Sequence, residues 1–137
     1  MKTAIDTNVF SALWAGEKTS AGLHEQLGEA SAQGALVICP VVFAEMHANP
    51  KMDEKLIRRF LDETGVFIEY HLQEAVWIEA GRRYAQYCRR RRSAGEEPRR
   101  LIADFVIGAH ALLQADRLIT LDRSRYRKDF PELILSD

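Results

Sequence analysis

The chain has few cysteines and no long apolar run, and each shortage excludes a class of protein. Two cysteines, Cys39 and Cys88, are too few for a disulfide framework, which favours a reducing compartment. No apolar stretch approaches the roughly 18–20 residues that span a bilayer, so we expect no membrane segment. The N-terminus, MKTAIDTNVF, has an acid where a secretory signal needs an apolar stretch. These absences predict a small cytoplasmic protein.

A large excess of charge of one sign is also missing. Nineteen Lys and Arg stand against twenty Asp and Glu, a net charge of −1, which argues against a protein that holds nucleic acid by bulk charge. The two halves differ, however. Residues 1–70 contain six basic and ten acidic side chains, whereas residues 71–137 contain thirteen and ten. The arginine-rich second half can therefore still offer a phosphate backbone one favourable face.

Length and pattern predict a single α/β domain over residues 1–137. The length is typical of one domain, and the hydrophobic fraction of 47% is too high for a disordered chain. Short apolar segments alternate with helical patterns, which predicts a three-layer α/β/α fold with a mostly parallel sheet. We expect strands at residues 2–5, 36–39, 66–68 and 118–121, and a fifth edge strand at 133–135.

Helical patterns fill the segments between the predicted strands. They cover residues 9–14, 20–34, 41–47, 52–64, 72–87 and 100–114. Thr7 or Asn8 is expected to cap the first helix, and the charged segment after Leu121 is expected to be a loop. The residues expected to face inward from helices 52–64 and 72–87 are Leu56, Phe60, Leu61, Ala75, Ile78, Tyr84 and Ala85.

Four acids fall where a parallel sheet can gather them. Asp6 closes the first predicted strand and Asp122 follows the fourth, while Glu45 and Asp104 lie in early turns of helices. Ligands of open α/β sheets bind outside the carboxyl ends of the strands, so all four acids can face one rim. Clustered carboxylates stay ionised only beside a cation, and Mg²⁺ or Mn²⁺ prefers oxygen ligands. Such a site would activate water for phosphodiester hydrolysis.

Each acid also has a simpler interpretation. An Asp at a strand end is often a helix cap or turn residue, and Glu45 on a helix would ordinarily be solvated. Asp104 is more informative, because it lies in an otherwise apolar stretch from Leu101 to Ala109. A lone acid there is costly unless it is paired or bound to metal. The alternative to a metal is an ion pair with Arg99 or Arg100.

Four short motifs follow one another along the chain. They are Asp6-Thr7-Asn8, Ala44-Glu45, the stretch Ala103-Asp104-Phe105-Val106-Ile107-Gly108-Ala109-His110-Ala111, and Thr120-Leu121-Asp122. In this order they resemble the PIN-domain ribonucleases, and most of all the VapC-type toxins of prokaryotic type II toxin–antitoxin pairs. The ending from Tyr126 to Pro131 resembles the tail of that group, so the likeness covers essentially the whole chain.

The resemblance implies a PIN fold, Mg²⁺- or Mn²⁺-dependent endoribonuclease activity, a homodimer and inhibition by a cognate VapB-type antitoxin. By position, the residues that match the family's catalytic acids are Asp6, Glu45, Asp104 and Asp122. Asp6, Asp104 and Asp122 are the expected metal ligands. Asn8 and Thr120 match the family's accessory polar positions. Asp122 matches the most variable acid of the family, and Asp116 and Asp129 are lower-ranked substitutes.

The arginine clusters are the predicted contacts for RNA. They are Arg89, Arg90, Arg91, Arg92, Arg123 and Arg125. The run that starts at Arg89 belongs to a segment, up to Arg100, that is longer and more arginine-rich than the family usually has. The same run is also typical of a solvated helix C-terminus, where cations complement the helix dipole. The arginines after the fourth strand would alternatively pair with an antitoxin tail.

Three other functions remain as alternatives. A housekeeping RNA-processing PIN nuclease would use the same carboxylates as a toxin, and a non-catalytic PIN module would bind RNA or protein without cutting. A phosphatase of the haloacid-dehalogenase kind also begins with an Asp at the end of the first strand. That chemistry expects a second acid two residues later, where this chain has Asn8, so it ranks last.

Overall fold

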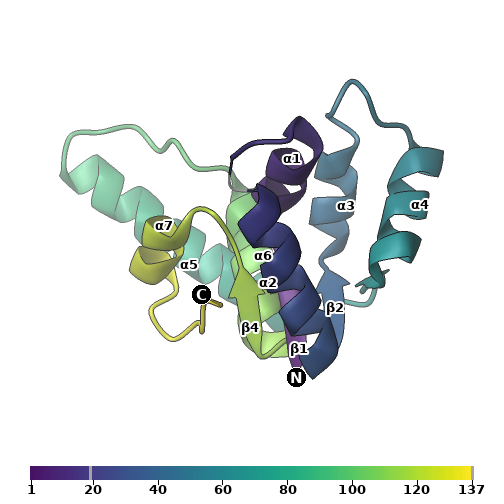
Figure 1. Ribbon diagram of the computed structural model, residues 1–137. Helices are drawn as coiled ribbons and strands as arrows, with labels where there is room; N and C mark the ends of the chain where they lie inside the picture. The colour runs from purple at the N-terminus through teal and green to yellow at the C-terminus, as the bar shows by residue number, and fades with distance from the viewer. Residues whose placement is uncertain (19, 137) are drawn as a thin grey trace.

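The computed structural model describes residues 1–18 and 20–136. Along these residues each of the first three strands is followed by two helices, and the fourth by one (Figure 1). In chain order they are β1 (Lys2–Ile5), α1 (Thr7–Ala15), α2 (Ser20–Gln33), β2 (Ala35–Ile38), α3 (Pro40–Met46), α4 (Glu54–Thr64), β3 (Val66–Ile68), α5 (Glu74–Ser93), α6 (Ile102–Gln114), β4 (Arg117–Ile119) and α7 (Arg123–Asp129). None of the helices in this part of the chain is both long and apolar enough to cross a membrane.

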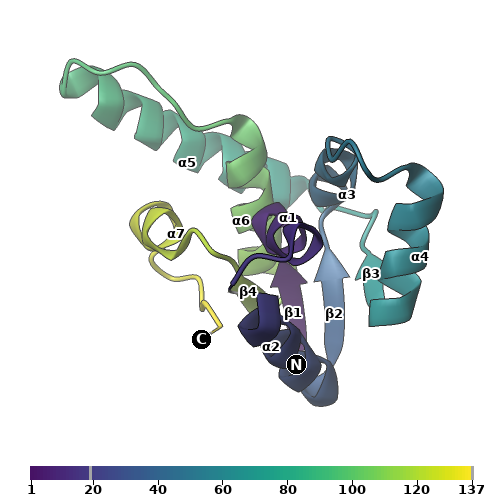
Figure 2. The ribbon, with the colours of Figure 1, turned by 45° about the horizontal axis from the view of Figure 1, so that its top comes forward.

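The four strands form one parallel sheet in the order β3-β2-β1-β4. β1 lies in the centre, where Thr3 is paired with Leu36 on one side and with Arg117 on the other. α2 covers one face of the sheet, and α5 and α6 lie behind the other (Figures 1 and 2). The predicted α/β class with a parallel sheet between helices is therefore confirmed, and all four carboxyl ends point the same way.

The segment expected to form a fifth strand does not form a full strand. Within the described residues, the segment from Leu133 to Leu135 contributes a single parallel bridge, between Leu118 and Leu135. The amide of Leu118 donates to the Ile134 carbonyl at 2.9 Å, and the Ser136 amide donates to the Leu118 carbonyl at 2.9 Å. Both bonds involve one residue of β4, so the tail touches the sheet edge without continuing along it.

The charged segment after β4 is a helix, α7, where a loop was predicted. Its buried positions are Tyr126 and Asp129, and Phe130 follows directly after it as a second buried aromatic ring. The spacing of four between the two rings is helical, but the surrounding arginines and lysine hid it in the sequence. α7 matters for the site because it begins immediately after Asp122.

Two of the predicted helix faces are wrong in part: Leu61 is buried and Phe60 and Tyr84 pack against the core as expected, but the other predicted positions do not. Leu56 is 42% exposed, and Ile57 and Leu61 are the buried residues of α4. In α5 the predicted contacts Ala75, Ile78 and Ala85 are exposed. Its buried residues are Val76, Ala80, Arg83, Tyr87 and Cys88. The four consecutive apolar residues at 75–78 are compatible with more than one buried face of the helix, and the buried position 83 is an arginine. The apolar pattern therefore could not show which face of α5 is buried.

The first two strand-to-helix junctions set the positions of two acids. Asp6, and neither Thr7 nor Asn8, is the cap of α1, because its backbone is extended and its Oδ1 accepts the Thr7 amide at 2.7 Å. β2 ends at Ile38, Cys39 is the N-cap of α3, and Pro40 is its first residue, where the missing N–H costs nothing. α3 then carries Glu45 toward the carboxyl edge of the sheet.

Candidate active site

Asp6 is a buried carboxylate at the carboxyl end of the central strand. Only 6% of its surface is exposed. Its Oδ1 accepts the Thr7 amide at 2.7 Å, and its Oδ2 accepts the Thr120 hydroxyl at 2.8 Å. β4 pairs with β1, and the Asp6 amide donates to the Ile119 carbonyl at 3.0 Å. The parallel pairing of these two strands therefore brings Asp6 and Thr120 together from 114 residues apart.

Burial raises the pKa of Asp6 from 3.8 to about 6. The hydrogen bonds from Thr120 and Thr7 oppose this shift, as does the nearby Tyr126 hydroxyl, and the charge of Asp104 adds to it. The Tyr126 hydroxyl is buried and completes no hydrogen bond of normal geometry among the described residues. The donors that Asp6 meets are thus neutral, and a cation beside this carboxylate would stabilise its ionised form.

The Thr120 hydroxyl links three of the predicted site residues. It donates to Asp6 and accepts the Asp122 amide at 3.0 Å. The Asn8 side-chain amide lies 3.4 Å from the same hydroxyl, and Asn8 Oδ1 accepts the Leu121 amide at 3.1 Å. Asp6, Asn8, Thr120 and Asp122 consequently form one hydrogen-bonded network at the ends of β1 and β4.

Glu45 reaches the same edge from α3. Its Oε1 accepts the Thr7 hydroxyl at 2.6 Å, and Thr7 follows Asp6 directly in the chain. The sequence interpretation did not single out Thr7 as a contact of Glu45, although it stands in the middle of the Asp6-Thr7-Asn8 motif. Through Thr7, the acid that follows β2 is tied to the acid that ends β1.

Asp104 lies in the first turn of α6 and is half-buried. Its negative charge acts on Asp6, whose pKa it raises. Its Oδ2 is also 3.6 Å from Nε of Arg100, so the ion pair that the sequence allowed as an alternative is present. Asp104 is therefore close enough to Asp6 for their negative charges to interact, and it also lies beside the guanidinium of Arg100.

The two lower-ranked substitutes lie elsewhere. Asp116 accepts the Lys2 amide at 2.6 Å, at the opposite end of β1 from Asp6. Asp129 is buried and forms ion pairs with Arg90 and Arg100. In the described part of the chain, neither carboxylate is hydrogen-bonded to Asp6, Asn8, Thr120 or Asp122.

The donor set of this edge fits a hard divalent cation. The acids present offer only carboxylate oxygens, and Asp6 is buried without a cationic partner among its hydrogen bonds. Within residues 1–18 and 20–136, no three His, Cys, Asp or Glu side chains are grouped closely enough to enclose a metal by themselves. Mg²⁺ commonly keeps several waters and takes only one or two carboxylates, so such a loose arrangement of acids is compatible with it.

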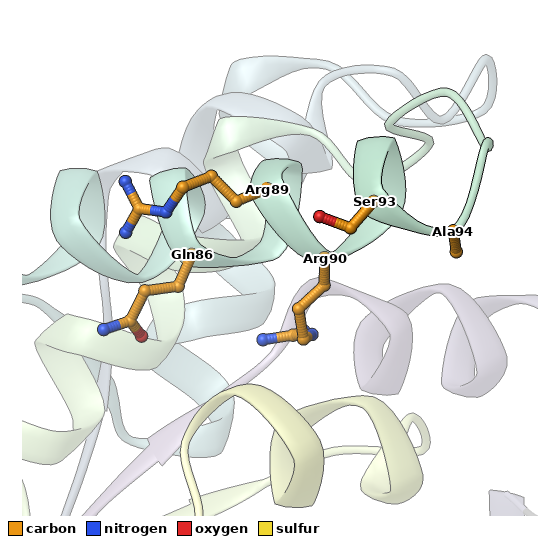
Figure 3. A pocket seen from close by; sticks show the side chains of 5 residues that line it. All are labelled: Gln86, Arg89, Arg90, Ser93 and Ala94. Atoms are coloured by element: carbon orange, nitrogen blue, oxygen red, sulfur yellow. The ribbon is translucent and has the colours of Figure 1, made fainter.

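Of the predicted RNA-binding arginines, Arg90, Arg91 and Arg125 line one cavity. Arg89 lies along the outer surface of α5, beside a shallow hollow, while Arg90 points toward α7 (Figure 3). Arg91 forms an ion pair with Glu96. Arg123 donates to the Ser136 carbonyl. Arg125 contacts the predicted acid Asp122, with its Nη1 3.4 Å from Asp122 Oδ2.

Comparisons with known proteins agree with this fold. The structure of VapBC2 from Rickettsia felis bound to a DNA fragment from their promoter matches with a TM-score of 0.67 and 19% identity, over 98% of this chain and 97% of that chain. The structure of VapBC-1 from nontypeable Haemophilus influenzae matches with a TM-score of 0.67 and 19% identity, over 100% and 98%. No curated protein matches by sequence.

At 19% identity these two likenesses show the fold alone. The profile of one family, described as the PIN domain, matches residues 3–131. That match covers most of the chain, including every acid of the network around Thr120. The chain belongs to the PIN domain family.

Proposed function

We propose that this chain is a Mg²⁺- or Mn²⁺-dependent endoribonuclease. The observation that carries the proposal is Asp6, a buried carboxylate at the carboxyl end of the central strand whose hydrogen bonds come from neutral groups. Membership of the PIN domain family supports it, because PIN domains are generally nucleases. RNA as the substrate follows from the resemblance of the four motifs to PIN-domain ribonucleases.

The residues have distinct proposed roles. Asp6, Asp104 and Asp122 are the proposed metal ligands, one or two of them bound directly to the ion and the rest through its water molecules. When bound, a divalent ion would lower the pKa of a water molecule and neutralise charge on the phosphodiester. Thr120 and Thr7 hold the two oxygens of Asp6 in place through their hydrogen bonds. Asn8 fixes the backbone between Thr120 and Asp122 through the Leu121 amide.

Glu45 is the proposed proton acceptor. The Thr7 hydroxyl donates to its Oε1, which leaves Oε2 to accept a proton from the attacking water. An acid that is held through one oxygen and open at the other keeps its orientation during proton transfer. This role is consistent with its half-buried position on α3.

We further propose that the enzyme is a VapC-type toxin. Both similar structures are named as VapBC proteins, and the chain aligns with each of them over nearly its full length. The proposal includes a VapB-type antitoxin as partner, a homodimer, a single PIN domain over residues 1–137 and a cytoplasmic location. A neighbouring short reading frame that encodes a DNA-binding protein would support the toxin role over RNA processing.

Cleavage of RNA tests the proposed function. Wild-type protein, Asp6→Asn and the control Asp62→Asn, which changes an exposed acid of α4, are induced in cells, and new RNA 5′ ends are mapped. We expect discrete cleavages from the wild type and the control, reduced by about 100-fold or more in Asp6→Asn. The purified wild-type enzyme should lose activity in EDTA. Cleavage that persists in both EDTA and Asp6→Asn would contradict the proposal, and metal binding without cleavage of any RNA would favour a binding module.

A further inference from the structure

A cavity of about 330 Å³ lies between the C-terminal turns of α5, the segment that leads back to α6, and α7. Both ribbon views show this segment returning along α5, with α7 beneath the helix (Figures 1 and 2). The cations that line the cavity are Arg90, Arg91, Arg99, Arg100, Arg125 and Lys128. Only two carboxylates, Glu96 and Asp129, lie in the same wall. The cavity is therefore strongly positive although the chain as a whole carries a net charge of −1.

Arg100 is the buried base of this cavity. It is 7% exposed, and its guanidinium lies 4.9 Å from the ring centre of Phe105 and 5.4 Å from that of Tyr126. Its Nη1 pairs with Asp129 and its Nε forms the longer ion pair with Asp104, but neither Nε nor Nη2, both buried, makes a hydrogen bond within the described part of the chain. Buried donors that make no hydrogen bond are unfavourable. This guanidinium would be satisfied by an anion that offers several acceptor oxygens.

The cavity adjoins the proposed active site on two sides. Arg100 Nε is 3.6 Å from Asp104, and Arg125 Nη1 is 3.4 Å from Asp122. Arg99 and Lys128 complete the wall with exposed side chains that take part in no ion pair among the described residues. A group bound in the cavity would thus lie next to a group bound at Asp104 and Asp122. The side chains of Arg99 and Lys128 are available to contact it.

We propose that this arginine cavity binds a phosphate group of the RNA beside the phosphodiester that is cleaved. The inference rests on the proposed nuclease function. Guanidinium groups donate in a planar fork that matches two phosphate oxygens. An RNA strand supplies one phosphate at the acids and another in the adjoining cavity, whereas an acidic peptide would place further carboxylates beside Asp104 and Asp122. The continuity of the two sites therefore favours RNA over a protein segment.

Salt-dependent RNA binding tests this inference. The probe is a fluorescein-labelled, mixed-sequence single-stranded RNA of about 20 nucleotides, followed by fluorescence anisotropy in EDTA. The test variant is Arg99→Gln/Lys128→Gln, and the control is Lys51→Gln/Lys55→Gln. The control removes the same two charges from exposed positions at and before α4, on the other side of the molecule from α7 (Figure 1).

We expect the test variant to bind about tenfold more weakly at low salt. Each phosphate contact on a single strand contributes about 0.7 to the slope of log K against log salt, so the slope should fall by about 1.4. The control should keep the wild-type slope, and each single substitution, Arg99→Gln or Lys128→Gln, should show about half of the change. Matching thermal unfolding curves would establish that all variants are folded.

Several results would overturn the inference. An unchanged slope in the test variant, or an equal change in the control, would show that the cavity is not a phosphate site. Loss of binding to a co-purified antitoxin with unchanged RNA binding would assign the cavity to a protein partner. If the wild type cleaves RNA and the test variant does so with the same KM, this inference fails while the proposed function stands. If no RNA is cleaved but the predicted loss of binding is seen, the nuclease function fails and the phosphate site stands.

Discussion

Asp6 and Asp129 are buried to almost the same extent, with 6% and 7% of their surface exposed, but they have opposite surroundings. Asp129 forms ion pairs with Arg90 and Arg100. Asp6 receives a backbone amide and a threonine hydroxyl, and burial raises its pKa to about 6. Among the described residues, Asp129 is paired with cations, whereas Asp6 accepts hydrogen bonds only from neutral groups.

This difference separates a structural acid from a functional one. Removing a carboxylate from water is costly, and nearby opposite charges offset that cost. Asp129 ties α5, the segment before α6 and α7 together through its two arginines. Asp6 lies at the carboxyl edge of the sheet, with the charge of Asp104 adding to its cost of ionisation. We infer that burial alone does not mark a catalytic acid, and that the absence of a cationic partner around a buried acid is the more informative sign.

The largest effect on stability is expected from Asp129→Asn. The substitution leaves Arg100 buried without its closest carboxylate, and breaking one side of a buried ion pair costs about 3–5 kcal/mol. Urea denaturation would measure the free energy of unfolding. Asp62→Asn serves as the control, with an expected change within about 0.5 kcal/mol. A loss below about 1 kcal/mol in Asp129→Asn would mean that the pairing is not structural.

The opposite sign is expected for Asp6→Asn in EDTA at pH 7.5. Below pH 3.8 the carboxyl group is protonated in both the folded and the unfolded chain and contributes nothing. Between pH 3.8 and about 6 it ionises mainly in the unfolded chain, so the stability of the folded wild type falls as the pH rises. At about 1.4 kcal/mol for each pKa unit, the full cost at pH 7.5 is up to about 3 kcal/mol.

Asn at position 6 removes this cost. The free energy of unfolding of Asp6→Asn should therefore exceed that of the wild type at pH 7.5, and the gap should close as the pH falls from 6 to 4. Denaturant melts at four pH values would measure it. If Asp6→Asn is instead the less stable protein at pH 7.5, Asp6 has a counter-charge that the comparison with Asp129 overlooks.

A smaller effect is expected for Thr120→Val. The lost hydroxyl donates to Asp6 and accepts the Asp122 amide, and a hydrogen bond of this kind contributes about 1 kcal/mol. Because the Thr120 bond lowers the pKa of Asp6, its removal should move the pH-dependent part of the stability curve to higher pH. Thr64→Val, which loses a bond to the Phe60 carbonyl in α4, should cost a similar amount without moving the curve. Identical pH profiles in the two variants would refute the assigned role.

The sequence was sufficient to predict the sheet and the placement of the acids. The strands are short apolar runs, and an acid directly after such a run must lie at the carboxyl edge of a parallel sheet. Asp6 was located in this way, and the positions of Glu45 and Asp104 followed from the helices that contain them. Asp122 also lies at this edge, but β4 ends at Ile119, two residues earlier than predicted, so Asp122 is not the residue directly after the strand. The linking role of Thr120 also agrees with its predicted position as an accessory polar residue.

Interactions between distant charges were not predictable in the same way. Arg100 and Asp129 are 29 residues apart, and no periodic pattern joins them. Arg83 is buried in α5 because Glu79 and Glu132 pair with it. A charged residue on the buried face made that face unrecognisable from the pattern of apolar residues. α7 was missed because exposed charged side chains surround its buried ring. The arginine run from residue 89 was predicted either to bind phosphate or to be a solvated helix end. A helix distributes consecutive residues around its axis, so Arg90 and Arg91 line the cavity beside α7 while Arg89 lies outside it.

Binding of Mn²⁺ at pH 7.5 is the most direct test of the central claim that Asp6 is prepared for a cation. Electron paramagnetic resonance of free Mn²⁺ during a titration gives the affinity of wild type, Asp6→Asn and Asp62→Asn. We predict that the wild type and Asp62→Asn bind Mn²⁺ with equal affinity, that Mg²⁺ competes, and that Asp6→Asn binds it at least about 10–100-fold more weakly. Equal Mn²⁺ affinity in the wild type and Asp6→Asn would contradict the account.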